Sequence, residues 1–347
     1  MSSVTIKDIA RAANVSIATV SRALNHDPCV TDAMQARVIA AANKLGYVPN
    51  SAAKSLKTNS SHTIGIVLSD ISNPDYIFIT RTIEDIVACE DYSLILCSTG
   101  DQSKRELNYL QMLLSKNVDG LILNTTGLNN DFVVKLSAKM PMLLLNRNIL
   151  NDSFRGDFIT TDSYKGIYQL TKQLLAMGHR RIYVIQGPSQ LTNNAERFRA
   201  FQDAMAENGL SVDESYPYLY SGEFTRETGV KAIRHLSTLV QQPTAVMTLS
   251  NVTMLGVLHE LINGPFHVRI PEELTLASYD SLPNIELLSI RPITAQFDNS
   301  AIGQRCAYSI LERIKTPSLQ NRTFTFEPTI MPGNALGFPQ SDPLPYE

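Results

Sequence analysis

The chain has 347 residues, of which 44% are hydrophobic, and this size and composition predict two or three domains with large cores. Its net charge of -3 is unevenly distributed, because residues 1–61 carry seven Lys or Arg against three Asp and no Glu. This segment therefore has a charge of +4 and the rest of the chain -7. A basic head on an acidic body favours a polyanionic partner for the head.

The sequence lacks the signals of several classes of protein. The sequence has no signal-peptide-type apolar run and no stretch of about 18 uninterrupted apolar residues, so we expect a cytoplasmic protein, associated with the nucleoid when bound to DNA. The four cysteines form no CxxC pair, which argues against a zinc site or a disulfide framework. No GxGxxG, GxxxxGK, HExxH or GxSxG motif occurs, so we expect no catalytic residues, no metal and no cofactor.

Residues 5–25, TIKDIARAANVSIATVSRALN, predict two short helices joined by a turn. In the first helix, apolar residues at helical spacing form one inward stripe, namely Ile6, Ile9, Ala10 and Ala13. Ser16 is a good N-cap for the second helix, whose Val20 and Leu24 would join the same core. The outer face of the second helix would carry Ile17, Ala18, Ser21, Arg22 and Asn25.

That outer face has the chemistry to read a DNA major groove. An arginine such as Arg22 can bond O6 and N7 of guanine together, and a small apolar side chain such as Ala18 can touch a thymine methyl group. This pattern predicts a helix-turn-helix. The alternative is an ordinary three-helix domain, which needs the same apolar spacing for its core.

A third helix follows and strengthens the helix-turn-helix interpretation. We expect Thr31 to cap it and Gly46 to end it, with a core side formed by Met34, Val38, Ala41, Ala42 and Leu45. The pair of motifs VSIATVSRALN and LGYVPNSAAKSLK, about twenty residues apart, resembles the lactose-repressor (LacI/GalR) family of bacterial transcription regulators. The resemblance covers almost the whole chain.

The resemblance implies a DNA-binding domain at 1–49 and a hinge at 50–61. The expected DNA contacts in the head are Thr5, Ser16, Ile17, Ala18, Thr19, Ser21, Arg22 and Asn25, and those in the hinge are Asn50, Ala53, Lys54, Leu56 and Lys57. Leu56 would occupy the family's intercalating position, wedging into the minor groove. From the residues alone, a flexible linker is the alternative for 50–61, because so short a helix is marginal in isolation.

From Thr63 onward, short apolar runs alternate with longer amphipathic segments, which predicts an α/β fold with parallel sheets. The runs are TIGIVLS, YSLILCS, VDGLILN, PMLLLNR, RIYVIQG, TAVMTLS and LTLASYD. We expect helices to start at Pro74 and at a capping box from Ser103 to Glu106, and to stop at Gly178 and Gly209. A break in periodicity near 150–162 predicts two similar lobes.

The resemblance adds that the chain crosses between the lobes three times, as in periplasmic sugar-binding proteins. It predicts a body at 62–340, with a first lobe at about 62–162 plus 293–320 and a second lobe at about 163–292 plus 321–340, and a tail at 341–347.

Ligands of open α/β folds bind beyond the carboxyl ends of the strands, so polar residues placed there are candidate ligands. Each of them alone could equally be a helix cap or a surface charge. The candidates are Asp75, Tyr76, Ser98, Asn146, Arg147, Asp162, Arg197, Phe224, Ser250, Asn251 and Asp280. Carboxylates, a guanidinium and a flat aromatic wall suit a sugar, a sugar derivative or a nucleoside.

The resemblance assigns roles to some of these candidates. Arg197 would match the family's effector-clamping arginine, Phe224 an aromatic stacking position and Asp280 a ligand-binding acid, with Asp75 and Tyr76 at the mouth of the site. The sequence departs from the family pattern in two places. Asn251 stands where the family commonly has Asp, and Ser278-Tyr279-Asp280 stands where the family has the motif GFD or GYD. The ligand class cannot be copied from a relative.

The resulting prediction is a homodimeric repressor that binds a pseudo-palindromic operator under the control of a small-molecule effector. Two alternatives are a solute-binding protein with the same body fold and a sugar-processing enzyme. The basic head and the expected lack of a signal peptide argue against the first, and the missing catalytic motifs argue against the second.

Overall fold

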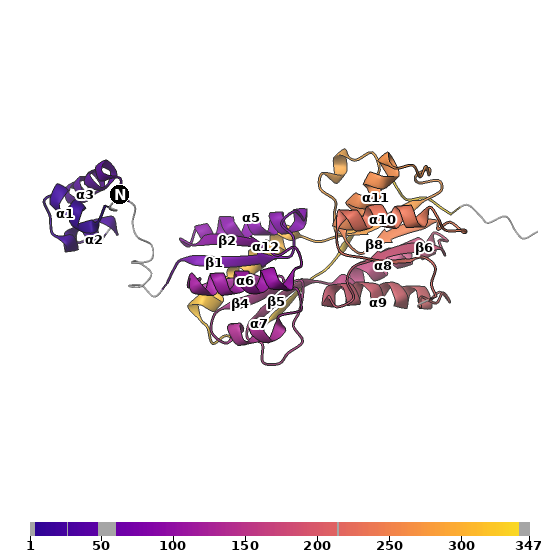
Figure 1. Ribbon diagram of the computed structural model, residues 1–347, viewed down its shortest axis with the longest axis horizontal. Coiled ribbons are helices and arrows are strands. Elements are labelled where there is room, and N and C mark those ends of the chain that lie inside the picture. Colours follow the sequence, from indigo (N-terminus) through magenta and orange to yellow (C-terminus); the bar gives the residue numbers. More distant parts are fainter. Residues whose placement is uncertain (1–3, 26, 48–59, 214, 340–347) are drawn as a thin grey trace, which may run out of the picture. The chain divides into compact units, whose positions relative to one another are not determined.

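The computed structural model describes residues 4–25, 27–47, 60–213 and 215–339. The chain divides into two compact units, Met1–Ser61 and His62–Glu347, called here the head and the body. Figure 1 shows a small helical unit and a larger one built of sheets and helices. No helix of the described residues is long and apolar enough to cross a membrane.

The head contains three helices, α1 (Ile6–Ala12), α2 (Ile17–Leu24) and α3 (Asp32–Leu45). Ile9, Val20 and Val38, one from each helix, are fully buried together. The Ser16 hydroxyl accepts a hydrogen bond from the Thr19 amide at 3.1 Å, which confirms the predicted cap of α2. Gly46 ends α3 in the left-handed conformation, with φ 66°.

One prediction for α3 is wrong, and another is confirmed only in position. Leu45 is 37% exposed and Tyr47 packs against the core of the head instead, because the left-handed turn at Gly46 redirects the chain. Thr31 occupies the N-cap position, but its side chain makes no capping hydrogen bond.

The first lobe of the body is a six-stranded parallel sheet in the order β11-β5-β4-β3-β1-β2. The strands are β1 (Thr63–Leu68), β2 (Ser93–Ser98), β3 (Gly120–Leu123), β4 (Met142–Leu145), β5 (Asp157–Thr161) and β11 (Thr323–Phe326). Helices α5 (Pro74–Ala88) and α12 (Asn299–Lys315) pack on one face. Helices α6 (Ser103–Ser115) and α7 (Asn130–Ser137) pack on the other.

The second lobe repeats this plan with the order β12-β10-β9-β8-β6-β7, in which only β12 runs antiparallel to its neighbour. The strands are β6 (Ile182–Gln186), β7 (Leu219–Ser221), β8 (Ala245–Thr248), β9 (Thr275–Tyr279), β10 (Ile293–Gln296) and β12 (Thr329–Met331). Helices α8 (Ser163–Ala176) and α9 (Thr192–Ala206) cover one face, and α10 (Arg226–Leu236) and α11 (Asn251–Asn263) the other. A short 3-10 helix, η1 (Ile285–Leu287), follows β9.

The chain crosses between the lobes three times, after β5, after β10 and after β11, as the resemblance implied. The predicted lobe boundaries need two corrections. Residues 293–296 form β10 in the second sheet, because they pair with β9, and only α12 of the segment 293–320 joins the first lobe. Residues 323–326 form β11 of the first sheet, because they pair with β5.

The seven apolar runs all form strands, and α5 begins at Pro74 as predicted. Gly178 and Gly209 adopt left-handed conformations just after α8 and α9. The predicted capping box of α6 is wrong. The buried Glu106 carboxylate accepts hydrogen bonds from the Thr126 amide at 2.5 Å and from Nδ2 of Asn129 at 2.9 Å, so it fastens the loop after β3 instead.

A buried ion cluster closes the amino end of β5. Asp157 is fully buried and accepts hydrogen bonds from Nη2 of Arg313 at 2.6 Å and from Nη2 of Arg322 at 2.8 Å. Burial alone would raise the pKa of Asp157, but the hydrogen bonds from Arg313 and Arg322 outweigh it and lower the pKa. The cluster therefore holds its carboxylate charged and ties α12 and β11 to the middle of the chain.

Candidate functional site

The outer face of α2 is accessible in the described head. Ile17, Ala18, Arg22 and Asn25 are exposed, with Ile17 at 49%, and Ser21 is half-buried. None of the four exposed side chains belongs to the core of the head. This arrangement leaves a mixed apolar and cationic face for a partner.

Several predicted DNA-contacting side chains are engaged within the head. The Asp8 carboxylate accepts from the amide and hydroxyl of Thr5, and the Ser16 hydroxyl also bonds the Thr19 hydroxyl at 2.8 Å. Nδ2 of Asn25 donates to the Ser21 carbonyl at 2.8 Å. These bonds orient the ends of α1 and α2. The hinge candidates Asn50, Ala53, Lys54, Leu56 and Lys57 lie outside the described residues.

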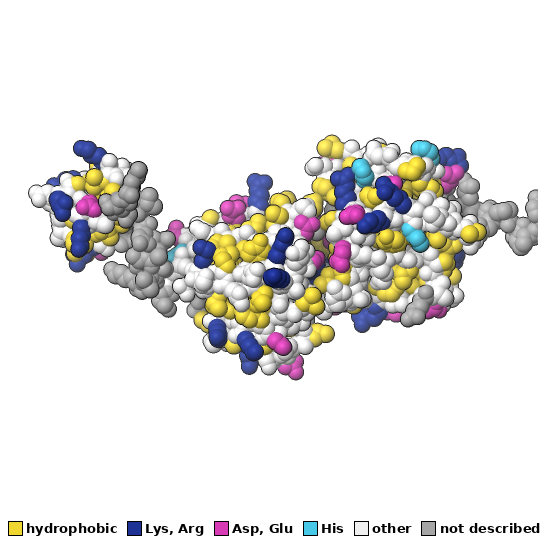
Figure 2. Space-filling view, viewed as in Figure 1, with side chains coloured by type: hydrophobic (Ala, Val, Ile, Leu, Met, Phe, Trp, Pro, Cys, Tyr) yellow, Lys and Arg dark blue, Asp and Glu magenta, His cyan; other side chains and the backbone are white. Residues whose placement is uncertain are grey.

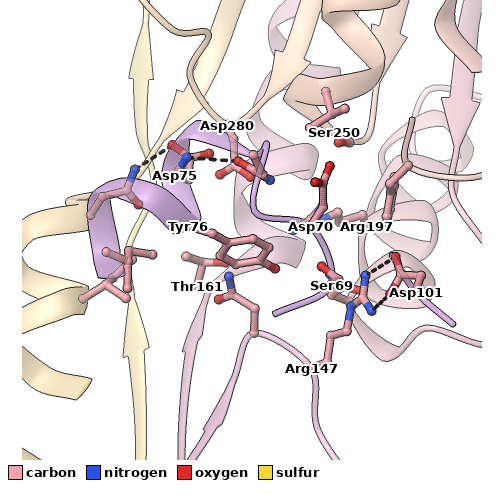
Figure 3. A pocket seen from close by; sticks show the side chains of 18 residues that line it. Ser69, Asp70, Asp75, Tyr76, Asp101, Arg147, Thr161, Arg197, Ser250 and Asp280 are labelled. Atoms are coloured by element: carbon pink, nitrogen blue, oxygen red, sulfur yellow. Dashed lines mark hydrogen bonds and ion pairs between the residues drawn. The ribbon is translucent and has the colours of Figure 1, made fainter. Parts of the chain in front are cut away.

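In the body, a cavity lies between the lobes where the carboxyl ends of strands from both sheets meet (Figure 3). Eight of the predicted effector residues line it, namely Asp75, Tyr76, Asn146, Arg147, Arg197, Phe224, Ser250 and Asp280. The sequence interpretation did not single out the lining residues Ser69, Asp101, Thr161, Asn193 and Asn299 for ligand binding. This inner cavity encloses about 50 Å³.

Asp75, on the first turn of α5, is the carboxylate through which the lobes meet. It accepts hydrogen bonds at 2.7 Å from Nδ2 of Asn251, on α11 of the second lobe, and from Nδ2 of Asn299, on α12. Burial raises the pKa of Asp75 to about 6, against those two hydrogen bonds and the charge of Arg197, which lower it. Asn251 does not line the cavity, but it joins the two lobes by donating to Asp75. A second carboxylate at position 251 could not donate this hydrogen bond and would repel Asp75.

Asp280 lines the same cavity, directly after β9, and lies near Asp75 (Figure 3). Burial, followed by the neighbouring charge of Asp75, raises its pKa well above the ordinary value. Arg197 is 5% exposed, and its guanidinium lies 3.5 Å from the ring centre of Tyr279 and 5.8 Å from that of Phe224. Its Nη1 donates to the Leu249 carbonyl at 2.8 Å, and this bond fixes the group in place.

Arg147 serves a different purpose from Arg197. Its guanidinium forms a double hydrogen bond with Asp101, and its Nη1 also donates to the Thr125 carbonyl at 3.1 Å. Burial lowers the pKa of Arg147, but the hydrogen bond and charge of Asp101 outweigh it and raise the pKa. The cation is therefore neutralised within the first lobe.

Three lining residues adopt left-handed backbone conformations, with φ of 56° at Asp101, 60° at Asn146 and 64° at Asp280. Such conformations are disfavoured for residues other than glycine, and they concentrate at functional sites. The amide oxygen of Asn146 is buried and has no hydrogen-bond partner within the described part of the chain. A ligand that donates a hydrogen bond would satisfy it.

The other predicted effector residues lie beside the cavity. The Ser98 hydroxyl accepts from the Ile71 amide at 3.3 Å, which shapes the loop after β1. The Asp162 carboxylate caps α8 by accepting from the Lys165 amide at 2.8 Å. Both have a structural partner, and neither lines the cavity.

Two family models together match most of the chain. Residues 5–50 match the model for bacterial regulatory proteins of the lacI family, and residues 61–329 match the model for periplasmic binding proteins and the sugar binding domain of the LacI family. The chain belongs to the lacI family. As a member of this family, it is a DNA-binding transcriptional repressor with a ligand-controlled body.

Individual relatives of this lacI-family chain agree. The HTH-type transcriptional repressor PurR of Vibrio parahaemolyticus is 30% identical over 96% of this chain and 98% of its own length. That of Photobacterium profundum is 29% identical over 94% and 97%. The Lac repressor dimer bound to operator and the anti-inducer ONPF has the same fold, with a TM-score of 0.79 at 20% identity over 96% of this chain and 99% of that one. These relatives are transcriptional repressors rather than enzymes.

Proposed function

We propose that the protein is a homodimeric, non-catalytic repressor that binds a pseudo-palindromic operator through α2, and that a sugar, sugar derivative or nucleoside bound between the lobes controls this binding. The supporting observation for the effector site is that Arg197 and Asp280 of the second lobe and Asp75 of the first line one cavity. Because a ligand there touches both lobes, its binding energy can change their relative orientation.

The proposal assigns base reading to Arg22 and apolar contacts to Ile17 and Ala18. Their exposure on one face of α2 supports this assignment. It also assigns to the hinge at 50–61 the role of coupling the body to the DNA, with Leu56 as the minor-groove wedge. The similarity of the hinge motif to the family supports this second assignment.

Dimerisation is proposed through the first lobe. Ile77 and Phe78 on α5 are each 54% exposed, and Leu96 on the edge strand β2 is 45% exposed. Figure 2 shows hydrophobic side chains gathered on this face of the lobe. An exposed apolar patch of this kind marks a protein interface, and the Lac repressor with the same fold is a dimer.

The test of the DNA assignment compares two arginine variants of the full chain. Arg22→Ala should weaken operator binding by about 1–3 kcal/mol per half-site and relax the preference at one base position, because a bidentate contact to guanine is lost. Arg37→Ala, an exposed arginine on α3, removes the same charge and should leave the base preference unchanged. Selection from random DNA pools followed by gel shift measures both. An unchanged base preference in Arg22→Ala refutes the assignment.

A further inference from the structure

The cleft between the lobes has a second, outer chamber of about 330 Å³, which shares Ser69, Asp70, Asp101 and Phe224 with the inner cavity. The inner cavity has room for only one or two water molecules, whereas small-molecule sites are typically about 300–1,000 Å³. A ligand of the described cleft therefore places its body in the outer chamber, against Phe224, and one polar edge in the inner cavity.

The charges around the two chambers are unequal. The described lining of the outer chamber includes Asp70, Asp101 and Glu223 and no Lys, Arg or His. The inner cavity adds Asp75 and Asp280, against Arg147 and Arg197. Five carboxyl groups thus face two guanidinium groups, and Arg147 is already bound on both amino groups by Asp101.

Arg197 is also committed. It donates to the Leu249 carbonyl and stacks on Tyr279, and these contacts hold its guanidinium in place. It faces two carboxyl groups, Asp75 and Asp280, whose pKa values burial has raised. A cavity in which burial disfavours the charged forms of Asp75 and Asp280 disfavours the charge of an added phosphate even more. The acidic residues of the outer chamber also repel anions before they enter.

We infer that the effector is an unphosphorylated, uncharged saccharide, and that sugar phosphates are excluded by charge. The inference rests on the proposed effector site. Hydroxyl groups of the ligand donate to Asp75 and Asp280 and accept from Arg197, and these bonds add no charge to the cavity. The apolar face of the sugar ring packs against Phe224.

The experiment is a thermal-shift screen of the full-length protein, confirmed by titration calorimetry. The probes are neutral mono- and disaccharides, including ribose, glucose, fructose and cellobiose, the phosphorylated forms glucose 6-phosphate and fructose 1-phosphate, and the purines hypoxanthine and guanine. We expect at least one neutral saccharide to raise the melting temperature of the body, because a ligand that binds only the folded state stabilises it. The sugar phosphates should bind at least tenfold more weakly than that saccharide.

Two variants locate the binding. Asp280→Asn keeps the shape of the side chain and should weaken the saccharide at least tenfold. Glu272→Gln, an exposed acid outside both chambers, removes one charge and should leave its affinity within twofold. Equal losses in the two variants would contradict binding in the cleft.

The inference is overturned if a sugar phosphate or a purine binds while no neutral saccharide of the panel does, or if none of the probes binds. Gel shift with pseudo-palindromic DNA separates this outcome from failure of the proposed function. A chain that binds operator and is controlled by a sugar phosphate or a purine refutes only the ligand class. A chain that binds no pseudo-palindrome refutes the proposed function itself.

Discussion

Two acidic sites of the first lobe differ in how their charge is balanced. At the amino end of the first sheet, Asp157 accepts from two arginines, and its pKa is lowered. At the carboxyl end, Asp75 receives hydrogen bonds from two neutral amides, and its pKa is raised to about 6. The first site is complete as folded and fastens the lobe. In the second, the hydrogen-bond donors are neutral amides and no arginine of the described residues is paired with the carboxylate as at Asp157, which suits a ligand site.

The largest expected effect comes from breaking the complete site. Asp157→Ala should destabilise the body by about 3–5 kcal/mol, because it leaves Arg313, whose side chain is 4% exposed, as an unpaired buried charge. Calorimetric unfolding of the full chain measures this on the transition of the body. A loss below about 1 kcal/mol would show that Asp157 is not the anchor of the lobe.

A smaller change in stability, of opposite sign, is expected when Asp75 is replaced. The raised pKa of Asp75 means that the wild-type body loses stability as pH rises from about 4 to about 6, since the folded state holds a proton that the unfolded chain releases. Asp75→Asn cannot titrate, so the stability of the variant relative to wild type should improve by an amount on the order of 2 kcal/mol between pH 4 and pH 7.5. Any constant cost of the amide cancels in this difference.

The measurement for Asp75 is the melting temperature of the body for both proteins at each pH. Asp152→Asn, an exposed acid away from the cleft, is the matched control and should show no such trend. A pH-independent difference between Asp75→Asn and wild type would mean that burial does not hold a proton on this carboxyl group.

The smallest effect is expected at the partly exposed member of the complete site. The side chain of Arg322 is 31% exposed, and it shares Asp157 with Arg313. Arg322→Ala leaves the buried pair intact and should cost up to about 1 kcal/mol, as for pairs open to solvent. Urea unfolding measures it. A cost equal to that of Asp157→Ala would show that Arg322 rather than Arg313 balances the acid.

The sequence predicts the buried parts of the fold well. Six of the seven long apolar runs become inner strands of a sheet covered on both faces, and the seventh forms β2, the edge strand of the first sheet. Five strands were not predicted, β5, β7, β10, β11 and β12. Two of them have patterns unlike the apolar runs: β5 alternates between buried and half-buried residues, and β11 is half exposed at the edge of its sheet. Pairing with distant partners, rather than local hydrophobicity, makes these segments strands.

The site was predictable where a residue directly follows a strand. Asn146 and Asp280 are of this kind, since each comes directly after a strand that was recognised. Asn299 was missed because it begins a helix 224 residues from the carboxylate it contacts. Asp101 was missed because it lies in a loop beyond β2, and only the partner at Arg147 reveals its role. Asp162, which we predicted from its position at a crossover, caps α8 and does not line the cavity, and its contact with a ligand stays a prediction.

The three crossings between the lobes bear on how the protein is made. The first lobe begins at β1 but lacks α12 and β11 until synthesis has passed Phe326, near the end of the chain. Until then the face that Ile302, Cys306 and Ile310 later cover, beside α5, stays open on the nascent chain. Domains that are continuous in sequence can fold as they leave the ribosome. In this protein the second lobe can also finish only after the chain has returned to it at β12, which follows β11 directly, so the two lobes are completed one after the other, and a chain cut before Asn299 would leave an open, aggregation-prone sheet.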